Sequence, residues 1–354
     1  MIDSHGKLSE FLPALRAAQW VALDTEADSL HAYPEKLCLI QISTAGGDRL
    51  VDPLAPIDLT RLWPELKKHR LIIHGADYDL RLLRKNHAFV PHRIFDTMLA
   101  SRLLGEREFG LFNLVQRHLG VALEKGSQKA DWARRPLTPR MEAYARSDTR
   151  YLKPLSDILT GQLREKQRLS WLEQSCDRLI ADCAMASQPE PDLVWRLKGS
   201  NKLSRQNLAV LREIWHWRER EALAANRPPY FVLSHETLIR IATTADHEPI
   251  DPLLPRHFSA RRKDGLLEAI QKGIHLDPQE HPHPLRSHSR RQTEAERRRF
   301  LELEERRNRR AAQLGLDPSL IASRATLLAL ASDWEQHEKE LMHWQLQLLH
   351  PKAD

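Results

Sequence analysis

The sequence predicts an N-terminal α/β domain with a central sheet, followed by two all-helical domains. Short apolar runs alternate with helical periods over about the first 100 residues, and strand signals nearly vanish beyond Gln188-Pro-Glu-Pro191. The two helical segments that follow this Pro-rich break also resemble one another. A chain of 354 residues is long enough to form more than one core.

The first domain is expected to cover residues 1–190. A helix-like stretch at Leu59–Lys68 precedes the fourth expected strand, and the pattern becomes helical from Asp96 onward. One long helix is predicted over residues 161–186, because its pattern stops at the Pro-rich break. The expected strands are the apolar runs Trp20–Leu23, Leu37–Ile42, Leu50–Val51 and Leu71–Ile73.

The two helical domains are expected at residues 196–278 and 290–354. In the second, ERRNRRAA and LIASRATLLALA resemble WRER-EALA and VLSHETLIRIA about 88 residues earlier, although Glu305 stands where the first copy has Trp217. The pattern favours a duplicated helical module. The Pro- and His-rich stretch between the copies is interpreted as a linker, so we expect its histidines to be loop residues rather than metal ligands: His281, His283 and His288.

Helical spacing in the first of these modules separates core residues from candidate phosphate contacts. The apolar residues on one helix face are expected to form the core rather than a ladder for stacking bases: Leu208, Leu211, Ile214 and Trp217. Arginines are better candidates for contacts with phosphate: Arg218, Arg220, Arg227 and Arg240.

Composition indicates a polyanionic partner and argues against a membrane protein. The net charge is +6 and the pI is near 9.3, with basic clusters in the second half of the chain, although acidic residues interleave in the last cluster. No run of about 18 apolar residues occurs, so no membrane span is expected. The first residues show no basic segment followed by an apolar stretch, so no secretory signal is expected. Three cysteines without CxxC spacing, Cys38, Cys176 and Cys183, are expected to be buried reduced thiols in a cytoplasmic protein.

Four acidic residues of the first domain form the candidate catalytic set. Asp24 and Glu26 lie two apart at the end of the first strand, which places both side chains on one face. Asp79 follows the strand that ends at Ile73, and Asp148 lies four residues after Tyr144 in a helical stretch. Any one of these acids could instead be a helix cap or a surface residue. Their combination favours a shared site.

Carboxylates that cluster in a core repel one another unless a cation lies between them. Oxygen ligands without Cys or His favour Mg²⁺ or Mn²⁺ over Zn²⁺. Two such ions about 4 Å apart would activate a water and stabilise the leaving 3′ oxygen of a phosphodiester. The Tyr144 phenol could orient the attacking water.

The motifs resemble those of ribonuclease D, a 3′→5′ exonuclease of the tyrosine-containing branch of the DEDD superfamily. DTE, with the following YP-x-x-LCLIQI, resembles the first exonuclease motif, HGADYDL the second and YARSD the third. DWARRPLT is typical of ribonuclease D and not of proofreading polymerases. LREIWHWREREALAANRPPYFVLSHETLIRIA is similar to the HRDC domain shared with RecQ-type helicases, and residues 290–354 resemble a divergent second copy.

This resemblance implies a ribonuclease H-like fold, with a mixed central sheet flanked by helices. It also implies that Asp24, Glu26, Asp79 and Asp148 are metal ligands or their close supports, Asp79 acting through a water as in relatives. Tyr144 is then the residue that orients water. The cofactors are two divalent ions, Mg²⁺ or Mn²⁺.

Three further residues are candidate substrate contacts. His74 could face the substrate or be a satisfied buried histidine, and Asp96-Thr97 is interpreted as a helix cap. Lys129 could contact a phosphate. Trp132 could stack on a base or anchor the core, and the sequence leaves both open.

The expected function is removal of single nucleotides, as nucleoside 5′-monophosphates, from the 3′ end of structured RNA such as tRNA precursors. The partner is then RNA with a single-stranded 3′ end, and since no heptad run forces association, a monomer is expected. Two alternatives remain: a 3′→5′ DNA exonuclease, because no reader of the 2′-hydroxyl is identifiable, and a non-catalytic RNA-binding scaffold.

Overall fold

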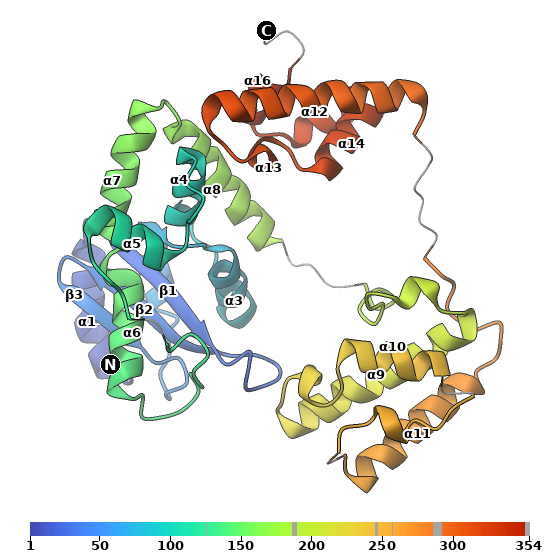
Figure 1. Ribbon diagram of the computed structural model, residues 1–354. Coiled ribbons are helices and arrows are strands. Elements are labelled where there is room, and N and C mark those ends of the chain that lie inside the picture. The colour runs from blue at the N-terminus through green and yellow to red at the C-terminus, as the bar shows by residue number, and fades with distance from the viewer. Residues whose placement is uncertain (125, 186–189, 245–246, 257, 286–291, 351–354) are drawn as a thin grey trace. The chain divides into compact units, whose positions relative to one another are not determined.

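The computed structural model describes residues 1–124, 126–185, 190–244, 247–256, 258–285 and 292–350. The chain divides into two compact units, coloured along the sequence in Figure 1. The first unit comprises Met1–Ala27, Leu37–Met185 and Arg290–Asp354, and the second comprises Asp28–Lys36 and Ala186–Ser289. The structure thus groups the predicted segment 290–354 with the α/β part of the chain.

The first unit contains one mixed five-stranded sheet in the order β3-β2-β1-β4-β5. β1 pairs antiparallel with β2 and parallel with β4; β2 and β3 are antiparallel, and β4 and β5 are parallel. The strands are β1 (Val21–Ala27), β2 (Leu37–Thr44), β3 (Gly47–Val51), β4 (Arg70–Ile73) and β5 (Arg93–Asp96). A mixed sheet flanked by helices confirms the predicted fold class of this part.

The four expected strands are confirmed, and one strand was missed. Every residue of β2 is buried, as a central strand with both faces covered requires. The missed strand, β5, has the sequence RIFD, in which only Ile94 and Phe95 are apolar. Two apolar residues between charged ones do not give a strand signal.

Helices complete the first unit. Those that come before the Pro-rich break are α1 (His5–Ala17), α2 (Leu62–Lys67), α3 (Asp77–His87), α4 (Thr97–Leu104), α5 (Leu111–Leu119), α6 (Pro139–Arg150), α7 (Leu152–Glu165) and α8 (Leu169–Ala184). The C-terminal ones are α12 (Glu294–Leu314), α13 (Pro318–Ile321), α14 (Arg324–Ser332), α15 (Trp334–His337) and α16 (His343–Leu349), with a 3₁₀ turn at Glu338–Glu340.

Helix α6 lies against β1, β2 and β3, and so covers the sheet face that carries the candidate acids. A hydrogen bond of 2.7 Å between the Ser43 and Thr149 hydroxyls links the end of β2 to the end of this helix. Met141 and Ala145 pack with Leu39 and Leu50 of the strands beneath. The helix is therefore fixed along its length over the sheet.

The predicted long helix over residues 161–186 is wrong, because the structure has two helices there. Gln167 has a φ of 56°, in the left-handed region that ends a helix, and it separates α7 from α8. The next residue, Arg168, is buried and donates to the carbonyl oxygens of Leu103 (2.8 Å) and Leu314 (2.7 Å). The break thus directs a guanidinium onto two helix C-termini, where backbone carbonyls lack partners.

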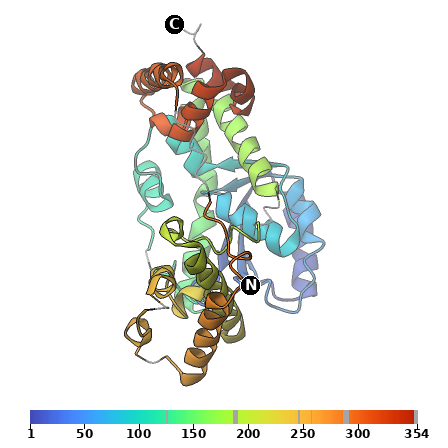
Figure 2. The same cartoon turned by 90° about the vertical axis from the view of Figure 1, so that its right-hand side faces the viewer.

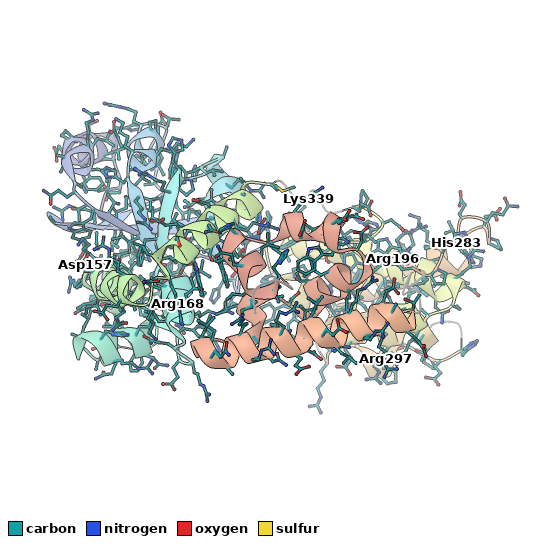
Figure 3. The ribbon with its side chains drawn as sticks, turned by 90° about the horizontal axis from the view of Figure 1, so that it is seen from above. Asp157, Arg168, Arg196, His283, Arg297 and Lys339 are labelled. Carbon is teal, nitrogen blue, oxygen red and sulfur yellow. The ribbon has the colours of Figure 1, made fainter. Side chains whose placement is uncertain are left out.

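The C-terminal helices pack on the α/β part through α4 and α8, as the neighbouring ribbons in Figures 1 and 2 show. The Trp171 and Trp344 rings stack with centroids 4.9 Å apart, and Arg168 lies between α8 and the end of α12 (Figure 3). Gly105 and Gly315, which follow α4 and α12, come so close that a Cβ on Gly105 would lie 2.2 Å from the Gly315 carbonyl oxygen.

The second unit has its own core, built on α9 (Arg205–Ala225), α10 (His235–Thr244) and α11 (Ala260–Ile274), with 3₁₀ turns at Ser200–Lys202, Pro229–Phe231 and Asp251–Leu253. The four predicted core residues of its first helix are buried, which confirms that prediction: Leu208, Leu211, Ile214 and Trp217. Arg218 was wrongly assigned to phosphate. The residue is 2% exposed, and its guanidinium bonds to Glu219 and to the Leu233 carbonyl.

The two helical segments share their local structure at an offset of 89 residues. Ser204 and Thr293 cap helices of 21 residues, α9 and α12, which end at the left-handed residues Asn226 and Gly315. The hydroxyls of Ser234 and Thr237 bond to each other at the start of α10, as those of Ser323 and Thr326 do at the start of α14. This agreement of caps supports the predicted duplication, and it aligns Trp217 with Arg306 rather than with Glu305.

Three expectations remain, on the cysteines, on a membrane span and on the linker histidines. The three cysteines are free and buried, which confirms their interpretation as thiols. In the part of the chain that the structure covers, no helix combines the length and apolarity needed to span a bilayer. His288 lies outside the described residues, while His281 bonds to the Leu276 carbonyl in a loop.

The contact between Gly105 and Gly315 gives a stability prediction. We expect Gly105→Ala to lower the free energy of unfolding by about 2–4 kcal/mol, since the methyl group would collide with a backbone oxygen and φ is +92°. Gly120→Ala is the matched control: φ is +69° there, but nothing lies within 4 Å of a Cβ, so we expect a cost of about 1–2 kcal/mol. Urea unfolding measures both, and equal costs would contradict the close packing of α12 on α4.

Candidate active site

The candidate acids come from three elements that meet at one end of the sheet. Asp24 and Glu26 lie on the same face of β1, two residues apart. Asp79 is buried in the first turn of α3, and Asp148 lies in the last turns of α6, four residues after Tyr144. All five line one pocket with a volume of about 470 Å³. The structure therefore brings together every residue of the predicted catalytic set.

Three of the carboxylates are close enough to share an ion. One oxygen from each of Asp24, Glu26 and Asp148 lies within 4.8 Å of the other two. Asp79 is outside this trio, and its carboxylate accepts a hydrogen bond of 2.5 Å from the Thr25 hydroxyl. The trio thus forms the compact part of the site.

Burial raises the pKa values of all four acids, and repulsion from other members of the set adds to the shift at Asp24, Glu26 and Asp148. Burial, followed by the charges of Asp148 and Asp79, raises the pKa of Glu26 to about 9. Burial also raises the pKa values of Asp79 and Asp148 to about 7, and that of Asp24 well above its ordinary value. Among the residues that the structure describes, no Lys or Arg forms an ion pair with any of the four.

Tyr144 stands over these acids. Its hydroxyl donates a hydrogen bond to Asp148, which lowers the pKa of that carboxyl, and Gln128 bonds to the phenol in turn. Burial, together with the charges of Asp148 and Glu26, raises the pKa of Tyr144 above its usual value, so the phenol keeps its proton. Trp132 packs beside the ring, with centroids 6.1 Å apart, and fixes its position.

Of the other residues predicted from the sequence, some lie at the pocket and some do not. His74 lines the pocket, and its Nδ1 lies 2.9 Å from the Thr97 hydroxyl; burial lowers its pKa, so the ring is neutral at pH 7. Asp96 caps α4 through the Met98 and Leu99 amides, which confirms its predicted role. Lys129 is exposed and is not among the residues that line this pocket.

Trp132 is corrected to a core residue. Its side chain is 1% exposed and lies in a cluster with Cys38, Leu39 and Met141, so no face of the indole is available for a base. Of the two roles that the sequence left open, the structure supports the core anchor.

Several pocket residues were not predicted. Tyr78, 45% exposed, lies within HGADYDL, and Phe112 and Asn113 lie in LFNL at the start of α5. An exposed aromatic between two motif acids was the signal available for Tyr78. Gln41 does not line the pocket but lies opposite Asp24 in the β1–β2 register. It is fully buried, and neither of its amide atoms has a hydrogen bond among the described residues.

The raised pKa values predict that the acids destabilise the metal-free protein at neutral pH. Asp148 keeps its proton up to about pH 7 in the folded protein, whereas its ordinary pKa is 3.8. Stability that is fully present below pH 3.8 is therefore lost as the pH rises through about 7. We expect Asp148→Asn to be more stable than the wild type by roughly 2–4 kcal/mol at pH 8 in chelator, and equally stable near pH 4.

Urea unfolding with chelator at the two pH values measures this difference. Asp157→Asn, an exposed acid on α7, serves as the control and should change little at either pH. Added Mg²⁺ should raise the stability of the wild type at pH 8 and not that of Asp148→Asn. A wild type as stable as Asp148→Asn at pH 8 would show that the buried acids do not destabilise the metal-free protein.

Comparison with known proteins identifies both parts of the chain. Residues 1–164 match the DNA_pol_A_exo1 family, described as 3′-5′ exonuclease, and residues 207–247 match the HRDC domain. Ribonuclease D of Zymomonas mobilis is 32% identical over 292 residues, which cover 80% of this chain and 74% of that protein. Ribonuclease D of Gluconacetobacter diazotrophicus is 31% identical, with 76% and 70% covered.

A solved structure agrees in fold. The crystal structure of Escherichia coli RNase D matches with a TM-score of 0.76 and 24% identity, over 100% of this chain and 99% of that one. By these matches, the four acids and Tyr144 lie in an exonuclease domain, and an HRDC domain follows it. The chain therefore belongs to the ribonuclease D family and is a 3′→5′ exoribonuclease.

Proposed function

We propose that this chain shortens structured RNAs, tRNA precursors among them, one nucleotide at a time from a single-stranded 3′ end, releasing nucleoside 5′-monophosphates. The observation that carries this proposal is the trio of Asp24, Glu26 and Asp148, whose oxygens lie within 4.8 Å of one another in an open pocket. The E. coli relative is described as an exoribonuclease involved in structured RNA processing, and we extend that substrate class to this chain.

The donor set fits divalent metal ions. Its members are carboxylates only, which Mg²⁺ and Mn²⁺ prefer, and their raised pKa values reflect negative charges without a cation to compensate them. Asp24, Glu26 and Asp148 would hold the divalent ions, and Asp79, held by Thr25, would support them through a water. When bound, two ions supply charge neutralisation at the scissile phosphate, an activated water and stabilisation of the leaving 3′ oxygen.

The chain's own residues then position the reactants. Tyr144 keeps its proton and donates it in a hydrogen bond to Asp148, so its oxygen can accept a hydrogen bond from the attacking water and orient it instead of acting as a strong base. His74, neutral and held by Thr97, lies on the pocket wall where a ribose or phosphate of the last nucleotide would pass. Tyr78 and Phe112 offer aromatic surface for the terminal base at the same pocket.

The direct experiment uses an end-labelled RNA with a single-stranded 3′ tail and its DNA counterpart. We expect a ladder that shortens from the 3′ end of the RNA with Mg²⁺ or Mn²⁺, and no shortening with chelator or with Asp24→Asn. Preferred degradation of the DNA would favour a DNA exonuclease. Tight RNA binding without shortening under either metal would leave a non-catalytic scaffold. A cytoplasmic monomer remains our expectation, and sedimentation of the purified protein tests the monomer.

Tyr144→Phe tests the water-orienting role separately from metal binding. We expect kcat to fall roughly 10²-fold or more with little change in KM, because a group that positions the attacking water contributes this much to the transition state. Mn²⁺ binding, followed by calorimetry, should remain. Tyr151→Phe removes a phenol at the end of the same helix and does not line the pocket, so its kcat should match the wild type. Equal losses in the two variants would contradict the role of Tyr144.

A further inference from the structure

A second cavity, of about 610 Å³, lies within the first unit, where the end of α4 meets the turn from α12 to α13. One wall contains Arg102, Arg107 and Phe109, and the other contains Gly315, Leu316 and Leu320. The backbone contact between Gly105 and Gly315 and the buried Arg168, which bonds both helix ends, hold the two walls together. A volume of this size suits a small organic group such as a nucleotide.

The cavity offers an aromatic ring beside guanidinium groups. Phe109 is 36% exposed, and the Arg102 guanidinium lies over its ring, 5.4 Å from the centroid. Arg107 is exposed and has no ion pair or hydrogen bond among the described residues. An aromatic face with adjacent arginines is the combination that binds single-stranded nucleic acid, because a base stacks on the ring while a cation meets the phosphate.

The two acids of the cavity are already engaged. Glu106 accepts hydrogen bonds from Arg117 (2.7 Å) and His118 (2.8 Å). Asp317 caps α13 by accepting from the Ser319 amide at 2.8 Å, and this bonding lowers its pKa. Among the described residues neither acid forms an ion pair with Arg102 or Arg107, so the positive charge of these two arginines favours an anion over a cation as the ligand.

The same stretch of chain borders this cavity and the active site. Gly105–Phe109 contribute to the second cavity, and the next residues, Gly110–Asn113, line the pocket that holds the acids. Phe109 and Gly110 are neighbours in sequence, so their Cα atoms are about 3.8 Å apart. An RNA strand that leaves the active site along this stretch would meet the second cavity within a few nucleotides.

We propose that this second cavity binds one nucleotide of the RNA tail, upstream of the scissile bond, with its base against Phe109 and its phosphate at Arg107. The proposal rests on the proposed function, since the ligand is the same RNA. It assigns the C-terminal helices a direct part in substrate binding, because Gly315, Leu316 and Leu320 form one wall of the site.

The test compares Phe109→Ala and Arg107→Gln with the wild type on RNAs whose single-stranded 3′ tails increase in length. On long tails we expect KM to rise about tenfold with kcat unchanged, from the loss of one stacked base or one phosphate contact. On the shortest tails, which end before the cavity, both variants should match the wild type. Arg61→Gln removes an exposed arginine that lines neither pocket, and it should leave KM unchanged at every length.

A crosslinking measurement places the RNA independently of kinetics. With a photoreactive uridine at successive tail positions and no divalent metal, we expect one upstream position to crosslink to the tryptic peptide Ala311–Arg324, which forms the far wall of the cavity.

Either of two kinetic results would overturn the proposal. Variants that match the wild type on all tails would show that the cavity does not bind the RNA tail, so that it binds a protein partner or no ligand. Equal losses on the shortest and longest tails would mean that the substitutions disturb the active site itself. Failure of the proposed function is distinct from both, because the wild type would then shorten no RNA.

Discussion

Four carboxylates lie in one pocket, and within the described part of the chain no Lys or Arg pairs with them, so the surrounding fold has to hold them there. Strand β1 supplies two of them, and neighbouring helices α3 and α6 supply the others. α6 is held on the sheet by the bond between Ser43 and Thr149 and by packing of Met141 and Ala145. Without such anchoring, repulsion between the acids would move the helix away from the strand. The rigid sheet and helix thus keep the site ready for positive charge.

The local part of this site was predictable from sequence, because strand and helix periods fix which side chains share a face. Asp24 and Glu26 are two apart on a strand, and Tyr144 and Asp148 four apart on a helix, so their pairings follow from spacing alone. Their meeting with Asp79 depends on long-range packing, and the resemblance to a family supplied that step. The role of Trp132 could not be read from sequence, since a core tryptophan and a base-stacking one look alike until burial is known.

Predictions made from local sequence pattern failed where tertiary contacts decide the structure. The helical period of residues 161–186 gives no sign of the left-handed Gln167, which is followed by a buried Arg168 bonded to Leu103 and Leu314. Likewise, Arg218 has the charge of a surface residue but is satisfied inside the second unit. The docking of residues 292–350 on α4 and α8 was also beyond the sequence, because the same helical pattern suits a free module or a packed one.

The grouping of the chain into units has a consequence for its connectivity. The chain leaves the first unit after α8 and returns to it at α12, so the first helical module is an insertion with two covalent attachments. A single proteolytic cut in either connection would therefore leave both fragments joined through the folded first unit. Two cuts would still leave the module packed against Asp28–Lys36, in which Tyr33 bonds to Asn226 and Glu219 of the module.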